Sequence, residues 1–149
     1  FCDSSSMEIR DNFEYTKDRL IVFEENARHI AFDNQDRKHC FRCTVDGGII
    51  KEGNRCDFLL IVSDANDVNN RNQEHYIELK GIDVKHAIEQ LDTSINRIRH
   101  NRVDKRCAYV VCKRVDSPIK TFIQKAKSDF KRRYNSELLI RTNFEPVKV

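Results

Sequence analysis

The feature that most constrains this chain is a short apolar segment that carries two charged residues. Residues 75–80 read His-Tyr-Ile-Glu-Leu-Lys, and this pattern predicts a β-strand. Because side chains alternate between the faces of a strand, Glu78 and Lys80 project to the same side as Tyr76, and the aliphatic residues between them point into a core. A carboxylate and an ammonium group in such a strand are costly to bury unless they are paired or bind a ligand.

A second carboxylate opens the preceding apolar segment. Asp57 stands before Phe-Leu-Leu-Ile-Val, and residues 56–62 are predicted as a strand. If Asp57 faces Glu78 from an adjacent strand, two carboxylates converge on one point. Mg²⁺ takes oxygen ligands of this kind, usually one or two carboxylates completed by water and phosphate oxygens. Lys80 would then lie beside the metal, where it can orient a water molecule or stabilise a developing negative charge.

The order Asp57, an interval, then Glu78-Leu79-Lys80 resembles the D…(D/E)-x-K signature of PD-(D/E)XK nucleases. That superfamily includes restriction endonucleases, Holliday-junction resolvases and recombination-type exonucleases. The resemblance implies one or two Mg²⁺ ions, with Mn²⁺ able to substitute, bound by Asp57, Glu78 and the backbone carbonyl of Leu79. It also implies that Lys80 orients the attacking water while a phosphodiester bond, in DNA rather than RNA, is hydrolysed.

The flanking positions follow the family in part. Cys56 stands where the namesake motif has a proline. Gly81 and a helix carrying Gln90 come next, and in the family a glutamine after the core motif often supports the site. Gln90 also fits a plain boundary position on its helix, beside the apolar stripe. The pattern spans roughly residues 40–115.

Further acidic and histidine residues are candidates for completing the site. In the family an N-terminal helix often adds an acidic residue, and Glu8 and Glu14 are the candidates here. A second set is Asp46 with His39 or His86, although a histidine such as His86 also fits an ordinary surface position.

Two basic runs are candidates for contacting nucleic acid, although the net charge of the chain is only +3. The residues concerned are Arg97, Arg99, Arg102, Lys127 and Lys131. Contacts with phosphates would make binding sensitive to salt. Such runs are also typical of solvated helix faces, and Glu78 with Lys80 also fits a structural ion pair. The alternative function is therefore a catalytically silent nuclease-like fold that binds nucleic acid or protein.

Six cysteines raise the question of metal or disulfide bonding, and Cys40-x-x-Cys43 has half of a zinc-site spacing. No second C-x-x-C or paired-histidine motif follows it. Reduced thiols in a cytosolic protein are the alternative interpretation, and Cys107 and Cys112 fit small core residues. A small zinc-dependent interaction domain is the third functional hypothesis.

The order of predicted elements indicates an α/β fold. We expect a restriction endonuclease-like mixed β-sheet flanked by helices on both faces, formed by residues 1–149 as a single domain. Residues 1–19 are expected to form a short helix or an arm. The other expected elements are two strands within residues 20–32 or a helix there, a strand in 40–50, a loop over 63–73, a helix capped by Asp83, a strand over 107–113, a helix from Ser117-Pro118 and an edge strand over 138–141.

The composition favours a globular protein. No apolar stretch approaches the roughly 20 residues that a membrane-spanning helix requires. We expect a cytoplasmic or nucleoid-associated location and allow for a homodimer. The sequence leaves open whether cleavage is endonucleolytic or exonucleolytic.

Overall fold

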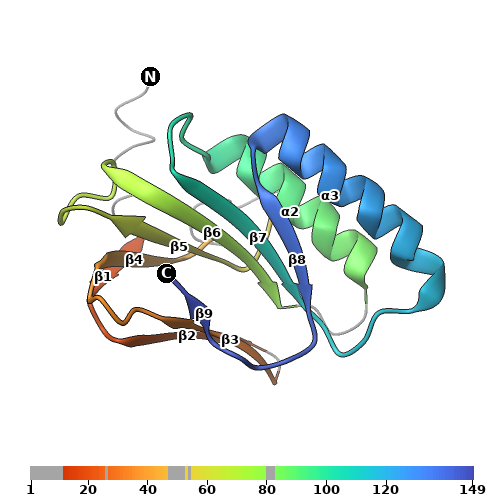
Figure 1. The fold of residues 1–149 in the computed structure, drawn as a ribbon, viewed down its shortest axis with the longest axis horizontal. Helices are drawn as coiled ribbons and strands as arrows, with labels where there is room; N and C mark the ends of the chain where they lie inside the picture. The colour runs from red at the N-terminus through yellow and green to blue at the C-terminus, as the bar shows by residue number, and fades with distance from the viewer. Residues whose placement is uncertain (1–11, 26, 47–52, 54, 80–82) are drawn as a thin grey trace.

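The computed structural model describes residues 12–25, 27–46, 53, 55–79 and 83–149, and Figure 1 shows them as two β-sheets and two long helices. The strands are β1 (Phe13–Thr16), β2 (Leu20–Glu25), β3 (Arg28–Asp33), β4 (His39–Thr44), β5 (Phe58–Ser63), β6 (Arg71–Leu79), β7 (Lys105–Val111), β8 (Glu137–Arg141) and β9 (Val147–Lys148). The helices are α2 (Val84–Ile98), the short 3₁₀ helix η1 (Ser117–Ile119) and α3 (Lys120–Tyr134). The predicted mixed α/β class is confirmed.

The larger sheet has the strand order β1-β4-β5-β6-β7-β8. Neighbours from β1 to β6 are antiparallel, whereas β6, β7 and β8 run parallel. Helix α2 connects β6 to β7, and α3 connects β7 to β8. The strand with Glu78 therefore lies at the boundary between the antiparallel and the parallel half of the sheet.

Both helices pack on the same face of this sheet, so the prediction that helices flank both faces is wrong for the described residues. One core joins Leu91 of α2 and Phe130 of α3 to Leu59 and Tyr76 of the sheet. The physical reason is the order of the connections. Two successive right-handed crossovers that advance in the same direction place their helices on the same side.

The opposite face is covered by a second sheet, of order β2-β3-β9 (Figure 1). Phe23 and Phe32 of this sheet pack against Leu60, Ile77 and Tyr109 of the larger one. The larger sheet is thus buried on both faces, by helices on one and by strands on the other. This explains why β5 is apolar from Phe58 to Val62 and does not alternate.

Helix α2 matches its prediction closely. The Asp83 side chain accepts a hydrogen bond from the backbone N–H of His86 at 3.0 Å, which confirms the predicted N-cap. The predicted stripe is buried from Val84 to Ile98, and Ser94 is buried with it. Helix α3 ends at Asn135, whose φ of 51° is the left-handed conformation common at helix ends.

Smaller differences concern the antiparallel half. Residues 13–16 form strand β1 where a helix or arm was expected, and β6 already begins at Arg71, within the predicted loop. The two strands expected in residues 20–32 and the edge strand after α3 are confirmed as β2, β3 and β8. No helix of the described residues is long and apolar enough to cross a membrane.

Candidate active site

Asp57 lies where β5 begins and β6 ends. Its backbone N–H donates to the carbonyl of Ile77 at 3.1 Å, and its Oδ2 accepts from the N–H of Leu79 at 2.9 Å. Asp57 is only 6% exposed. Because Leu79 follows Glu78 directly, these bonds place the carboxylate of Asp57 beside the residue that comes after Glu78 in β6.

The surroundings of Asp57 disfavour its charged form. Burial raises the pKa of the Asp57 carboxyl to about 6, the N–H of Leu79 acts in the opposite direction, and the carboxylates of Glu25 and Asp46 raise it further. A structural carboxylate is normally paired with a cation, whereas the described neighbours that act on the charge of Asp57 are other acids. The start of β5 therefore concentrates negative charge that a bound cation would neutralise.

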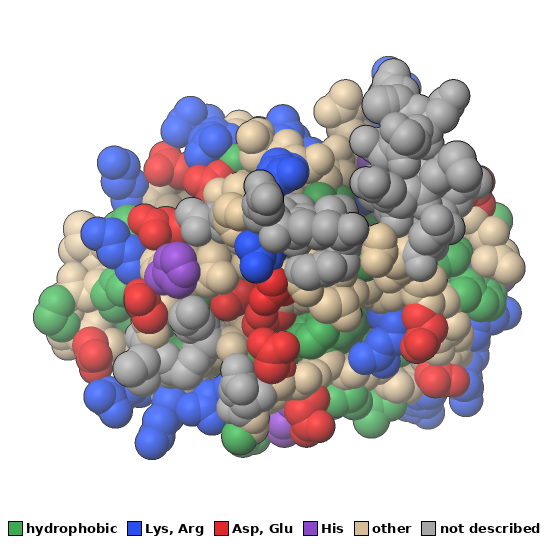
Figure 2. All heavy atoms as spheres, turned by 180° about the vertical axis from the view of Figure 1, so that it is seen from behind, with side chains coloured by type: hydrophobic (Ala, Val, Ile, Leu, Met, Phe, Trp, Pro, Cys, Tyr) green, Lys and Arg blue, Asp and Glu red, His purple; other side chains and the backbone are tan. Residues whose placement is uncertain are grey.

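Glu25 is the acidic residue that the sequence interpretation missed. It ends β2 in the smaller sheet, is exposed, and its carboxyl hydrogen-bonds with that of Asp57. No sequence signal separates Glu25 from the neighbouring Glu24, because the contact arises only when the two sheets pack. Figure 2 shows acidic side chains gathering near the middle of one face of the molecule, with lysine and arginine side chains spread around them.

Glu78 is 2% exposed and lies in the buried part of β6. Its neighbours confirm the predicted alternation, because Tyr76 belongs to the core on the helix side, and Ile77 and Leu79 belong to the core on the other side. Lys80 and Gly81, which complete the family signature, lie outside the described residues.

The pKa of Cys56 is influenced by the charges of both Asp57 and Glu78. Burial raises the pKa of the Cys56 thiol to about 12, and the charges of Glu78 and Asp57 also act to raise it. One buried sulfur therefore lies within electrostatic reach of both predicted acids, on the segment that leads into Asp57.

Helix α2 fixes that segment with two polar side chains. Gln90 Nε2 donates to the carbonyl of Arg55 at 3.0 Å, and Ser94 Oγ accepts from the backbone N–H of Cys56 at 2.7 Å. These bonds anchor the two residues before Asp57. Gln90, predicted as a catalytic residue, is thus placed to position the backbone beside Asp57, and Ser94 shares this role.

The other candidate residues separate into near and far. Asp46 is near, since it influences Asp57 and forms an ion pair with Arg55 at 2.5 Å. His39 lies at the other end of the sheet, opposite Ser63 at the end of β5. His86 is on the surface, 3.6 Å from Glu89.

The predicted N-terminal acids do not supply a ligand in the described structure. Glu14 lies on β1, is largely exposed and is 4.0 Å from Arg42. Glu8 lies outside the described residues. Glu25 occupies the position beside Asp57 for which these two residues were candidates.

The predicted basic residues lie toward the other end of the sheet. Arg99 and Arg102 line an open hollow of about 520 Å³ with Asn69, just before β6 begins. From there to Glu78 the strand rises about 23 Å. Arg97 is in the last turn of α2, at the same end of the sheet, because α2 runs back along β6. These residues can reach only phosphates several nucleotides away from the carboxylates.

The basic residues of α3 are similarly placed. Lys131 pairs with Glu137 at 3.0 Å, and Glu137 is level with Cys107, near the start of β7. Lys127 lines the same edge, between α3 and β8. Arg106, part of the first basic run, is buried and unavailable to a surface partner.

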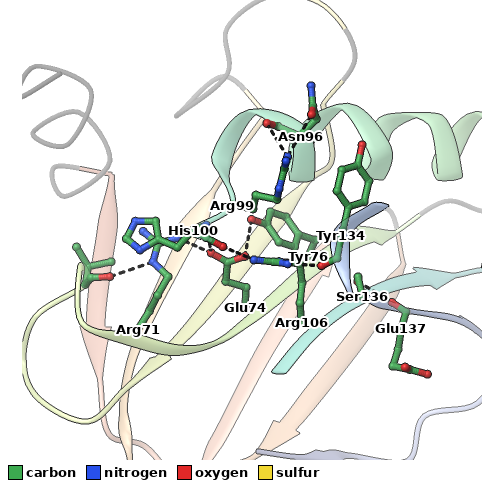
Figure 3. A network of polar contacts seen from close by, with 11 residues as sticks. Arg71, Glu74, Tyr76, Asn96, Arg99, His100, Arg106, Tyr134, Ser136 and Glu137 are labelled. Atoms are coloured by element: carbon green, nitrogen blue, oxygen red, sulfur yellow. Dashed lines mark hydrogen bonds and ion pairs between the residues drawn. The ribbon is translucent and has the colours of Figure 1, made fainter. Parts of the chain in front are cut away.

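Arg106 belongs to a buried polar network that sequence reasoning also missed (Figure 3). The carboxylate of Glu74, which is fully buried, accepts from Arg71 at 2.9 Å and from Arg106 at 2.8 Å. It also accepts from the hydroxyl of Tyr76 at 3.1 Å and from the N–H of His100 at 2.9 Å. The remaining nitrogens of Arg106 donate to backbone carbonyls. Here opposite charges satisfy one another.

The zinc hypothesis conflicts with the geometry of β4. Cys40 packs in the core on the side of the smaller sheet, and Cys43 packs in the core on the helix side. Burial raises the pKa of the two thiols to about 11 and about 12. Two protonated thiols on opposite faces of a sheet cannot bind one metal ion.

Within residues 12–25, 27–46, 53, 55–79 and 83–149, no three histidine, cysteine, aspartate or glutamate side chains form a ready-made metal cage. A Mg²⁺ ion held by Asp57 and Glu78 would therefore have to keep several waters, as Mg²⁺ bound by one or two carboxylates does. Comparisons of the chain with family models, with curated proteins and with solved structures found no match.

Proposed function

We propose that this chain is a metal-dependent nuclease that hydrolyses phosphodiester bonds, with DNA as the preferred substrate. The observation that carries the proposal is the buried carboxylate of Asp57, bonded to Leu79 beside Glu78 and facing the acid Glu25. The order of elements β4, β5, β6, α2 and β7 supports a restriction endonuclease-like arrangement. In it, Asp57 stands directly before β5, and Glu78 lies near the end of β6.

The donor set fits a hard divalent cation. Asp57, Glu78 and the carbonyl of Leu79 would hold Mg²⁺, and Glu25 offers a further oxygen ligand from the second sheet. The raised pKa of Asp57, which burial and neighbouring acids cause, supports this, because such a group gains most from a cation. A bound Mg²⁺ would lower the pKa of a water molecule and neutralise charge on the scissile phosphate.

The residues of the chain have distinct proposed roles. Asp57 and Glu78 hold oxygen atoms at fixed positions, and Lys80 orients the attacking water. Gln90 and Ser94 act as positioning residues, because they anchor the backbone that leads into Asp57.

Cleavage assays test the proposal directly. Circular DNA, linear DNA and RNA are incubated with the protein in Mg²⁺, Mn²⁺ or EDTA. We expect cleavage of DNA that requires the metal and falls at least 100-fold in Asp57→Asn and in Lys80→Ala. The matched control is Asp36→Asn, which removes an exposed aspartate far from Asp57 in sequence and should leave the rate unchanged.

The same variants separate the alternative function. Binding of DNA without cleavage in every metal would replace the nuclease proposal with a silent nucleic-acid-binding module. Metal binding is measured separately, by the rise in melting temperature on adding Mg²⁺ at pH 8, which we expect for the wild type and not for Asp57→Asn.

A further inference from the structure

Strand β8 forms one edge of the larger sheet and, among the described residues, has a strand neighbour on one side only, β7. The carbonyl of Arg141 accepts from the N–H of Cys112, so the backbone of Arg141 faces β7. Because backbone groups alternate along a strand, those of Leu138 and Ile140 face outward. This edge offers two donors and two acceptors to an added strand.

The side chains of β8 are self-complementary. Leu138 packs in the core on the helix side, so Glu137, Leu139 and Arg141 alternate with it and leave the strand toward the other face. Within one chain the Glu137 carboxylate turns to Lys131 of α3, and Arg141 donates to Asn143 at 2.9 Å, so a cross-strand pair would exchange these partners. Leu139 is 39% exposed and is one of the exposed large hydrophobic residues of the described chain. When Glu-Leu-Leu-Ile-Arg is laid antiparallel to itself, Leu139 opposes Leu139, and each Glu137 opposes Arg141 of the second copy.

We propose that this chain forms a two-fold homodimer in which the β8 strands of two copies pair antiparallel, centred on Leu139. The outward amides and carbonyls of Leu138 and Ile140 then form four backbone hydrogen bonds across the axis, and Leu139 lies at a non-hydrogen-bonded position where opposing side chains are close. The same strand edge of each copy supplies the donors, acceptors and charges that the other copy needs, which is the property of an isologous interface.

Strand β8 is short and lies beside basic residues, which limits the strength of this dimer. Lys131 already pairs with Glu137 at 3.0 Å, and Lys127 lines the same edge, so the two α3 helices oppose close approach. The contact is near the small end for stable interfaces, and we expect a dissociation constant on the order of micromolar.

The pairing also has a geometric consequence for the proposed function, although it does not depend on that function. Five strand spacings separate β6 of one copy from β6 of the other, about 24 Å in all. The two Glu78 residues would lie on the same face of one continuous sheet. A failure to cleave DNA would leave the interface proposal unaffected, because the two are measured by different assays.

Charge exchange tests the register. The masses of the wild type, Glu137→Arg and Arg141→Glu are measured by light scattering and sedimentation from about 1 to 200 μM, a range that spans the expected constant. We expect a concentration-dependent dimer for the wild type and at least 10-fold weaker association for each single variant. An equimolar mixture of the two single variants should recover the dimer, because every cross-strand pair is again of opposite charge.

Lys131→Ala is the matched control, since it frees Glu137 from its ion pair within one chain and removes a positive charge that opposes approach. We expect its dimer to be at least as stable as that of the wild type. Far-ultraviolet circular dichroism confirms that each variant is folded, and Leu139→Lys provides an independent disruption should either charge variant unfold. A monomeric wild type at 200 μM overturns the proposal. So does a dimer that survives Leu139→Lys, or a mixture of folded single variants that stays monomeric.

Discussion

Two of the buried carboxylates in and beside the larger sheet, those of Glu74 and Asp57, have opposite surroundings. Glu74 is enclosed by two arginines, a tyrosine hydroxyl and a backbone N–H. Among the described residues, Asp57 accepts one backbone N–H and faces the acids Glu25 and Asp46. A buried charge that is fully paired serves the fold, whereas one placed among like charges costs stability and is characteristic of functional sites.

Removing the paired carboxylate should have the largest effect on stability. In Glu74→Ala, Arg71 and Arg106 remain buried without their shared anion, and we expect a loss of about 3–5 kcal/mol in the free energy of unfolding. Urea denaturation measures it. Asp129→Ala is the control, because it breaks the exposed pair with Arg132 and should cost about 0–1 kcal/mol. Equal effects of the two variants would contradict a structural role for the Glu74 network.

Removing the charge of Asp57 should instead stabilise the protein. The raised pKa of about 6 means that the folded state holds the proton more tightly than the unfolded state, so wild-type stability falls as pH rises from about 4 to about 6. Above pH 6 we expect Asp57→Asn to be more stable by about 1–3 kcal/mol, since asparagine keeps an oxygen for Leu79 N–H.

Below pH 4 the gain should vanish, because Asp57 is protonated in both states. Thermal melts of the two proteins from pH 4 to pH 8, without divalent metal, measure the difference. A variant that is less stable than the wild type at pH 8 would assign Asp57 to the fold and remove the contrast with Glu74.

The smallest effect concerns the support of Asp57 by α2. Ser94→Ala leaves the buried N–H of Cys56 without its acceptor, and we expect a loss of about 1–2 kcal/mol. If Ser94 positions Asp57, the Mg²⁺-dependent rise in melting temperature should shrink as well, which a purely structural loss would not cause. Thr93→Ala, one position along the helix, is the control and should change neither quantity.

Local patterns gave much of the fold. The alternation around Glu78 and the capped, striped helix after Asp83 depend on neighbours a few residues apart, and both appear in the structure. The proximity of Asp57 to the strand that carries Glu78 could be predicted, because strands that are consecutive in sequence usually pair, and β5 and β6 do so. Lys80, which the same pattern predicted, stays a prediction.

The remaining features depended on contacts distant in sequence. Glu25 meets Asp57 only because a second sheet packs on the first, and Arg106 reaches Glu74 only because β7 lies parallel to β6. The helices share one face because both crossovers advance in the same direction. The hydrophobic periodicity within a single helix or strand does not determine that direction. Sequence alone thus determined which residues face together along each element, and the tertiary structure decided which elements meet, because that choice depends on long-range packing.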